Sequence, residues 1–419
     1  MRRILHSQRS IPIILRLLAM GSRFFLIFAL AKLLPPDDIG TYGLLTTITG
    51  YSVYVLGMDF YTYANRELIR SNPFMRRTIV HSQIAFELCV YGIALPLLIL
   101  IFPAGLLPWS MAIWFYLIAI GDHISNEINR TLIALLDQRA ASIVLFIRMA
   151  LVPLIAVPIM ILFPSLRTLG ILLGTWVVFD VLAILVGIRA INYHLPEESV
   201  GSVDWKWISR GIRTCSLFLI GTLCLRFLFT ADRQVVHYFD SLAAVAAYTF
   251  FMGIANGLGS ILDVSLYQFA YPEIVKAIHE EDTKKLKRKM KILTFQAVSL
   301  TVIVSSIAVL VAPYVVTWIG GGIYASYEWM LPLLMAAMAI YNLSTVPHYG
   351  LYGFGADKAI VKITIIATSS FVAVIAVLLF WRTGAVLSVI LGLGSASLVL
   401  LVGKTITLLK YIHRFNMTG

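Results

Sequence analysis

The chain has 419 residues, of which 59% are hydrophobic and only 13% are charged, and its formal net charge is +12. Soluble domains are usually about 45–50% apolar and about 25% charged, so this composition excludes a soluble enzyme with a polar surface. It equally excludes a disordered chain, which needs low hydrophobicity. The mean hydropathy of +0.88 instead indicates an all-α polytopic membrane protein.

Twelve apolar segments of membrane-spanning length follow one another along the chain, separated by charge clusters and by Pro or Gly. A helix needs about 20 residues to cross the hydrocarbon core. We predict spans at 11–33, 40–64, 78–102, 109–136, 141–163, 169–190, 211–238, 243–271, 292–316, 328–352, 359–380 and 385–409. The first segment starts like a signal peptide, but Arg16 and Arg23 interrupt its apolar stretch, so we expect an uncleaved span.

The basic residues are distributed unevenly over the connections between these spans. Of the 33 Lys and Arg, only Arg167 and Arg382 fall in the odd-numbered connections, whereas 23 fall in the two terminal tails, in the even-numbered connections or at the span ends that border them. Basic residues near span ends stay on the cytoplasmic side. We therefore expect both termini in the cytoplasm.

The longest central connection divides the twelve spans into two sets of six. This predicts an N-terminal six-helix bundle at 1–190, a cytoplasmic linker at 191–210 and a C-terminal six-helix bundle at 211–419. A shift of 206 residues places Tyr42 on Tyr248 and Glu67 on Glu273. Because both copies enter the membrane from the same side, the two bundles are predicted to form a parallel pseudo-repeat.

Arginines occur inside the predicted spans, where a charged side chain costs about 2.5–3.5 kcal/mol on insertion scales. Arg16 and Arg23 are seven residues apart on the first span, and Arg226 and Arg233 repeat this spacing on the seventh. Seven residues turn a helix by about 700°, so each pair shares one face. With Arg148 on the fifth span, they are candidate ligands for an anionic group, although Asp232 beside Arg233 leaves a structural ion pair open as the alternative.

Acidic residues and a histidine also lie at membrane depth. The fourth span carries Asp122, His123 and Glu127, and Glu87 and Asp180 lie near the middle of the third and sixth spans. These five residues are candidates for proton or sodium coupling, while an ion pair between Glu127 and Arg130 is the structural alternative. No resident cofactor and no metal site are expected, because the spacing offers no suitable third zinc ligand.

The basic run at 284–291 resembles a nucleic-acid patch in isolation. Next to a span on the cytoplasmic side, it is better explained as a topology determinant that contacts anionic lipid. Nucleic acid is therefore not an expected partner.

Three segments resemble the polysaccharide-biosynthesis flippases (O-antigen, or Wzx-type) of the MATE-like MOP superfamily. The segment LLAMGSRFFLIFALAKLLPPDDIGTYGLL at Leu17–Leu45 resembles the family's first helix and the turn after it. ADRQVVHYFDSLAAVAAYTF at Ala231–Phe250 resembles the junction of spans seven and eight. GGGIYASYEWMLPLLMAAMAI, followed by GFGADK at Gly353–Lys358, resembles the region of spans nine to eleven, but has Gly-Gly-Gly-Ile where an acidic residue is common.

This resemblance implies a non-enzymatic flippase in the bacterial inner membrane. Its substrate would be a polyprenyl-pyrophosphate-linked oligosaccharide repeat unit for O-antigen or exopolysaccharide. Two six-helix bundles would rock around a central cavity to move it to the outer leaflet. A polysaccharide polymerase and its chain-length machinery would be further partners.

Three other functions stay open. A multidrug or cation antiporter of the same fold would be expected to have an acidic cavity. A membrane glycosyltransferase would need catalytic carboxylates, for which Asp37 and Asp38 are the candidates, but such enzymes generally carry a large extracytoplasmic loop or domain. A scaffold without transport would not need the charges inside the spans.

Overall fold

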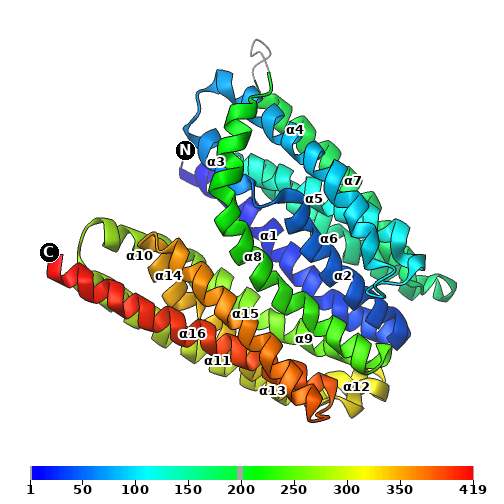
Figure 1. The fold of residues 1–419 in the computed structure, drawn as a ribbon. Helices are drawn as coiled ribbons and strands as arrows, with labels where there is room; N and C mark the ends of the chain where they lie inside the picture. The colour runs from blue at the N-terminus through cyan, green and yellow to red at the C-terminus, as the bar shows by residue number, and fades with distance from the viewer. Residues whose placement is uncertain (1, 196–201, 419) are drawn as a thin grey trace. The chain divides into compact units, whose positions relative to one another are not determined.

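The computed structural model describes residues 2–195 and 202–418, and every regular element in these ranges is helical (Figure 1). The chain folds as two compact units, Met1–Leu223 (unit 1) and Cys224–Gly419 (unit 2). The boundary between them falls inside one long helix, α8 (Trp205–Phe239). Each unit is described by itself.

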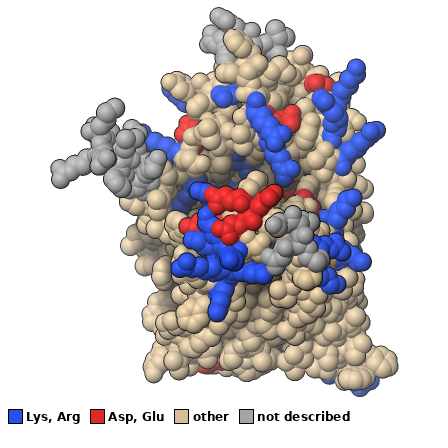
Figure 2. Space-filling view, turned by 90° about the vertical axis from the view of Figure 1, so that its left-hand side faces the viewer, with Lys and Arg blue, Asp and Glu red and all other residues tan. Residues whose placement is uncertain are grey.

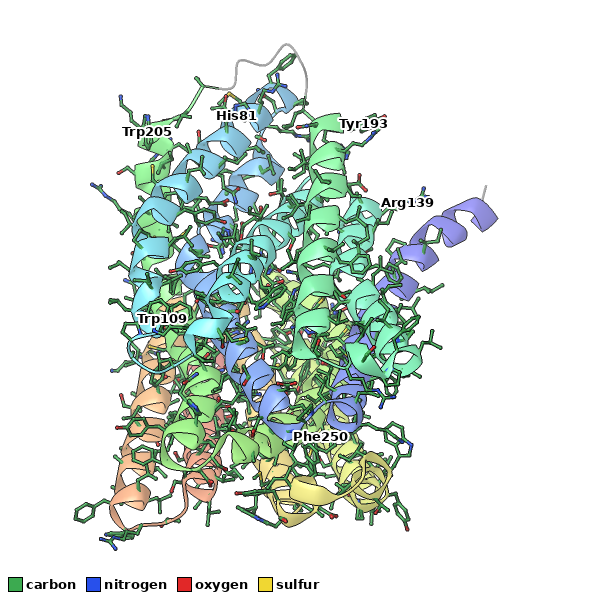
Figure 3. All side chains as sticks on the ribbon, turned by 90° about the vertical axis from the view of Figure 1, so that its right-hand side faces the viewer. His81, Trp109, Arg139, Tyr193, Trp205 and Phe250 are labelled. Carbon is green, nitrogen blue, oxygen red and sulfur yellow. The ribbon has the colours of Figure 1, made fainter. Side chains whose placement is uncertain are left out.

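Unit 1 contains seven further α-helices and three single turns of 3-10 helix in its described part. They are α1 (Arg2–Leu33), α2 (Pro36–Gly57), α3 (Tyr61–Arg70), α4 (Pro73–Leu98), η1 (Ile99–Ile101), η2 (Trp109–Met111), α5 (Ala112–Ala134), α6 (Gln138–Leu162), η3 (Pro164–Leu166) and α7 (Leu169–Tyr193). Figure 3 shows His81, Arg139, Tyr193 and Trp205 toward one end of this unit and Trp109 well away from it. The start of α6 and the end of α7 therefore lie at the same end, as expected for antiparallel neighbours.

Unit 2 continues from α8 with helices of more varied length. They are α9 (Leu242–Leu262), the π-helical turn η4 (Asp263–Tyr267), α10 (Gln268–His279), α11 (Thr283–Ile319), α12 (Gly322–Ser326), α13 (Met330–Leu343), α14 (Thr345–Gly353), α15 (Asp357–Phe380) and α16 (Ala385–Thr418).

Ten candidate spans in the described ranges are long and apolar enough to cross a membrane, which confirms a multi-pass membrane protein. A helix occupies each of the twelve predicted positions. The two that fall outside the ten are α2 and α5, which have 22 and 23 residues but also many polar side chains. The count of twelve spans depends on these two helices and stays a prediction.

Local chemistry explains where several helices begin. Pro36 occupies the first turn of α2, where its missing N–H costs no hydrogen bond, and Asp37 and Asp38 complement the positive helix end. The Asn72 side chain accepts a hydrogen bond from the Met75 N–H at the start of α4. Asp137 caps α6 in the same way.

The two units share the order of several helices and some of their contacts. α1 ends at Leu33 and α8 at Phe239, and α2 begins at Pro36 and α9 at Leu242, so both bounds are 206 residues apart. In unit 1, α5 packs on α2 and α7, and α6 packs on α7; in unit 2, α13 packs on α9 and α16, and α15 packs on α16. These contacts recur in both units, but the extensive packing of α1 on α6 has no equally extensive equivalent between α8 and α15 in the described residues, so the parallel pseudo-repeat stays a prediction.

Part of the predicted linker belongs to α8. From Trp205 onward it is helical, and Trp207 is buried in an aromatic cluster with Phe60 and Phe86. Gly211 allows this contact, because a Cβ there would lie 2.5 Å from the Phe60 ring. Residues 196–201 of the linker lie outside the described residues, and the predicted domain boundaries stay a prediction.

We expect Asp137→Ala to lower the free energy of unfolding by about 1 kcal/mol at neutral pH, because it removes the cap of α6. Burial raises the pKa of Asp137, but hydrogen bonds from the Ala140 N–H and the His194 ring outweigh this and hold the pKa below its usual value. A depressed pKa stabilises the fold above the unfolded value of about 3.9. That contribution disappears as the pH falls through the folded pKa.

Thermal unfolding of the purified protein at pH 7 and near pH 3 measures this difference. Asp137→Asn is the matched control, since asparagine is also a good cap. Equal melting of Asp137→Ala and the unchanged chain at pH 7 would contradict the expectation.

Candidate functional site

Charged side chains from four helices of unit 1 come together in one place, which we call the Arg–Asp cluster: Arg23 on α1, Asp122 on α5, Arg148 on α6 and Asp180 on α7. Arg148 interacts electrostatically with the other three members. The cluster unites residues that the sequence analysis had assigned to two separate roles, anion binding and ion coupling.

A small cavity adjoins this cluster. Arg23, Asp122 and Arg148 line it, together with two aromatic side chains, Tyr42 and Trp176, and apolar residues of α1, α6 and α7. The site is therefore polar on one side and apolar on the other.

Arg23 is the open member of the cluster. Its side chain is exposed and has no carboxylate partner among the residues that the structure describes. Its guanidinium carbon lies 5.9 Å from the centre of the Trp176 ring, a weak cation–π contact. The donors of Arg23 thus remain available at the edge of the cavity.

Arg148 is held, but loosely. Its Nη1 donates to the Asp122 carbonyl oxygen at 3.3 Å, to the Asp122 carboxylate at 3.5 Å and to the Ser125 hydroxyl at 3.4 Å. All three distances are long for charge-assisted hydrogen bonds, which are usually about 2.7–2.9 Å. Arg148 is buried and keeps capacity for a further acceptor.

Asp180 is the most buried member, with 1% of its surface exposed. Neither carboxylate oxygen accepts a hydrogen bond from the described residues. Gly121 of α5 makes room for it, because a Cβ at that position would lie 3.0 Å from Asp180 Oδ2. A buried carboxylate without donors is costly unless a proton or a cation compensates it.

A second polar group lies between α4 and α5 and is called the Glu87–Glu127 cluster. The Gln83 side-chain nitrogen donates to Glu87 Oε1 and to Glu127 Oε2, both at 2.9 Å. Arg130 pairs with Glu127 at 2.5 Å. This is the ion pair that the sequence analysis gave as the structural alternative to ion coupling. Two predicted coupling residues are therefore joined by a glutamine.

His123 lies at the α2 side of this second cluster. Its Nδ1 is hydrogen-bonded to the Tyr91 hydroxyl, and its buried Nε2 has no partner among the described residues. Gly57 of α2 leaves room for the ring, since a Cβ there would lie 2.7 Å from Nε2.

Arg16 does not line the cavity beside Arg23. It donates to the Ser142 hydroxyl at 3.1 Å and to the Gln138 side chain at 2.9 Å, at the first turns of α6. Although seven-residue spacing gives both arginines one face of α1, their neighbours differ.

In unit 2, the two predicted arginines also differ from each other. Arg233 is buried and pairs with Asp232 at 3.1 Å, and the Tyr248 hydroxyl donates to the same carboxylate at 3.1 Å. This is the ion pair that the sequence analysis gave as the structural alternative to anion binding by Arg233. Arg226 is exposed.

Some residues of these sites carry no charge and were not predicted. Trp176, Gln83 and Tyr91 are ordinary members of apolar segments in the sequence, and Tyr42 was noted there only for its match to Tyr248 in the repeat. No signal in the sequence assigned any of them to a site, because their role depends on which helices meet. Among the described residues, no group of three or more His, Cys, Asp or Glu is placed to hold a metal ion.

We expect Gly57→Ala to destabilise unit 1 by about 1–3 kcal/mol, because the added methyl group overlaps the His123 ring. Gly50 lies on the same helix with nothing within 4 Å of its added Cβ. Gly50→Ala is therefore the matched control and should be neutral or stabilising. Thermal unfolding measures both variants.

A double variant, Gly57→Ala with His123→Ala, separates this contact from a general effect of alanine in α2. If the contact is responsible, the cost of Gly57→Ala should largely disappear in the His123→Ala background. An unchanged cost there would show that the contact is not the cause.

No protein-family model matches the chain, and no curated protein matches it. Solved structures do. A multidrug-resistance MATE-family transporter of the MOP superfamily, in an inward-facing conformation, is 16% identical with a TM-score of 0.76, over 95% of this chain and 96% of that one. An outward-facing structure described in the same terms is 14% identical with a TM-score of 0.58, over 97% of this chain and 95% of that one.

A third structure is a MOP-superfamily transporter from Pyrococcus furiosus, described as having a binding pocket of reverse polarity. It is 15% identical with a TM-score of 0.59, over 97% of this chain and 94% of that one. These matches cover almost the whole chain at low identity. The chain therefore has the MATE-like fold of MOP-superfamily transporters, as the sequence predicted.

Proposed function

We propose that the chain is a flippase that moves a polyprenyl-pyrophosphate-linked oligosaccharide from the cytoplasmic to the outer leaflet of a bacterial inner membrane. The observation that carries the proposal is Arg23, an exposed guanidinium without a carboxylate partner in the described residues, at the edge of a polar cavity inside an apolar helix bundle.

The charge and shape of the site favour an anionic group. A guanidinium is always charged, and its planar donors match the oxygens of a phosphate in pairs. Arg23 and Arg148 both line the cavity, and the long hydrogen bonds of Arg148 leave it able to donate to a stronger acceptor. A pyrophosphate would satisfy both arginines, and Tyr42 and Trp176 offer aromatic faces to a sugar ring.

The fold suits a lipid-linked substrate. Pyrophosphate and sugar cannot cross about 30 Å of hydrocarbon unaided, whereas a polyprenyl chain is soluble there. A MATE-like fold allows the polar part to occupy a cavity that opens alternately to the two sides, while the tail stays in lipid.

Arg226 is the second residue assigned to the substrate. It lies in α8 seven residues before Arg233, the same spacing as between Arg16 and Arg23 in α1, and its side chain is exposed. Arg16 and Arg233 have supporting roles in this proposal, because Arg16 is bonded to α6 and Arg233 is paired with Asp232.

We assign coupling to Asp122 and Asp180 of the Arg–Asp cluster. Within the cluster, Asp180 is the buried carboxylate that accepts no hydrogen bond from the described residues. Protonation would remove its negative charge. Because Arg148 interacts with both carboxylates, a proton or sodium ion there would change how strongly Arg148 binds an anion. Glu87, His123 and Glu127 stay predicted coupling residues.

The cytoplasmic face is assigned to the end that carries the basic run, with both chain termini there. Within unit 2, Lys285 pairs with Glu280, and Lys289 pairs with Glu273. The hydrogen bond from Lys285 lowers the pKa of Glu280. Figure 2 shows Lys and Arg gathered with Asp and Glu above a broad uncharged surface. Anionic lipid would bind the basic side chains that do not take part in these pairs.

A multidrug or cation antiporter is the second candidate, because the similar inward- and outward-facing structures are described as multidrug-resistance transporters. Arg23 and Arg148 at the cavity argue against a cationic substrate, and the Pyrococcus relative is itself described by the reverse polarity of its pocket.

A glycosyltransferase is disfavoured, because Asp37 and Asp38 lie in the first turn of α2, where they complement the helix end. Polymerase and chain-length machinery remain proposed partners.

We expect the double variant Arg23→Ala, Arg226→Ala to lose at least about tenfold in translocation of a polyprenyl-pyrophosphate-linked glycan, the effect of about 1.4 kcal/mol of lost binding. Reconstituted vesicles and an external glycan-modifying reagent measure it. Arg139→Ala, Arg213→Ala is the control, as it removes the same charge from two exposed positions. Unchanged transport by the first variant would reject these roles.

We expect Asp180→Asn to remove the response of transport to an imposed proton or sodium gradient, because asparagine cannot take up or release a proton. Translocation is measured with each gradient separately and with none. Transport by the unchanged chain that ignores both gradients would refute ion coupling at this cluster. So would a full gradient response in the Asp180→Asn protein.

A further inference from the structure

A lysine of unit 2, Lys404 of α16, is buried inside a helix that is long and apolar enough to span a membrane. Only 7% of its surface is exposed. Basic residues near the end of such a helix usually extend to the headgroups or pair with a carboxylate. Lys404 does neither, because it forms no ion pair and no hydrogen bond with the residues that the structure describes.

The sequence of α16 explains why Lys404 lies inside. Leu400 comes one turn before it and Leu408 one turn after it, and both leucines are buried. Residues four apart share one face of a helix. Lys404 therefore occupies a position in the packed face of α16, whereas Lys410 on the same helix is exposed.

A second basic side chain, His348 of α14, lies beside Lys404. α14 contacts both α10 and α16 (Figure 1). Gly350 allows the close approach to α16, because a Cβ there would lie 2.7 Å from Leu408 Cδ1. His348 interacts electrostatically with Lys404, and its buried Nδ1 has no hydrogen-bond partner among the described residues. Two basic side chains thus meet here, each with hydrogen bonds unmade.

Aromatic rings of α10 and α14 adjoin this pair. The Tyr352 ring lies within 14° of parallel to the His348 ring, with 6.3 Å between their centres. The Tyr271 ring is 5.9 Å from Tyr352 and 5.1 Å from Tyr349. Because 40% of the Tyr352 surface is exposed, these rings connect His348 to the surface of unit 2.

A change of protonation alone would not complete this pair. Loss of a proton would remove the charge of Lys404, but the amine and His348 Nδ1 would still lack partners, and a buried polar group without one costs about 1–3 kcal/mol. A water molecule would supply hydrogen bonds but leave the ammonium uncompensated. The nearest acidic residue of α10 in sequence, Glu273, is paired with Lys289.

A phosphate meets both needs at once. It carries negative charge and several acceptor oxygens, so it can accept from the Lys404 ammonium and from a His348 Nδ1–H together. Positive charge nearby would attract it, because α10 also packs on α11, whose first turns carry the basic run at 284–291.

We propose that Lys404 and His348 form a binding site for a phosphate group, presented by the headgroup of a membrane lipid or by free inorganic phosphate. The aromatic rings between this pair and the surface form its entrance. The site lies within unit 2 and uses neither Arg23 nor Arg226, so it does not depend on the proposed flippase function.

Thermal unfolding of the purified full-length protein at constant ionic strength tests the proposal with three probes. They are dioctanoyl phosphatidic acid, inorganic phosphate and dioctanoylglycerol, which is the same lipid without its phosphate. We expect a phosphate probe to raise the melting temperature, as a ligand of the folded state does, and dioctanoylglycerol to leave it unchanged. Protection by phosphatidic acid alone identifies a lipid headgroup, and protection by inorganic phosphate identifies the free anion.

Three variants make the result specific. We expect Lys404→Met to raise the phosphate concentration for half-maximal protection at least about tenfold, which corresponds to about 1.4 kcal/mol. Without a probe it should melt no lower than the unchanged chain, because an apolar side chain replaces an unpaired buried charge. His348→Phe keeps a ring but removes both nitrogens, and should also weaken protection. Lys410→Met removes an exposed lysine of the same helix and should respond like the unchanged chain.

The proposal fails if neither phosphate probe raises the melting temperature of the unchanged chain. It also fails if Lys404→Met and the unchanged chain need the same concentration for protection, because the phosphate would then bind elsewhere, such as at the basic run. Neither outcome bears on the Arg23 and Arg226 experiment, which measures translocation of a lipid-linked glycan.

Discussion

The dominant constraint on unit 1 is the cost of holding charge within hydrocarbon. Arg148, Asp122 and Asp180 are drawn from three helices into one cluster, because each alone would be an uncompensated charge. Compensation is incomplete: Arg23 has no carboxylate partner in the described residues, and Asp180 accepts no hydrogen bond there. Charges that serve stability alone would be expected to close on one another, as Arg233 and Asp232 do in unit 2. The open cluster therefore supports the proposed anion site.

Glycines determine where these charged groups fit. Gly121 leaves space for the Asp180 carboxylate and Gly57 leaves space for the His123 ring. In each case the glycine on one helix lies against a polar side chain of another, so a close helix approach and a buried polar group occur at the same place. Small residues at helix contacts are typical of membrane bundles, and here they also fix the position of the titratable groups Asp180 and His123.

Helix positions could be predicted from the sequence because they depend on local hydropathy, and a helix occupies every predicted span. The contents of the sites depend on packing between helices, which hydropathy does not encode. Equal spacing on α1 placed Arg16 and Arg23 on one face, yet Arg16 bonds to Gln138 of α6 and Arg23 borders the cavity. Gln83 was missed because a lone neutral amide in an apolar segment gives no signal, although it joins two predicted residues, Glu87 and Glu127.

The two polar clusters of unit 1 differ in how their charges are paired. At the Arg–Asp cluster, Arg23 has no carboxylate partner among the described residues, which supports the proposed anion site. At the Glu87–Glu127 cluster, the Gln83 side-chain nitrogen donates to both carboxylates, and Arg130 pairs with Glu127. α5 supplies Asp122 to the first cluster and Glu127 to the second, five residues apart, which is about 7.5 Å along the axis. A shift of α5 would therefore change both sites at once, and this helix is the most direct physical connection between them.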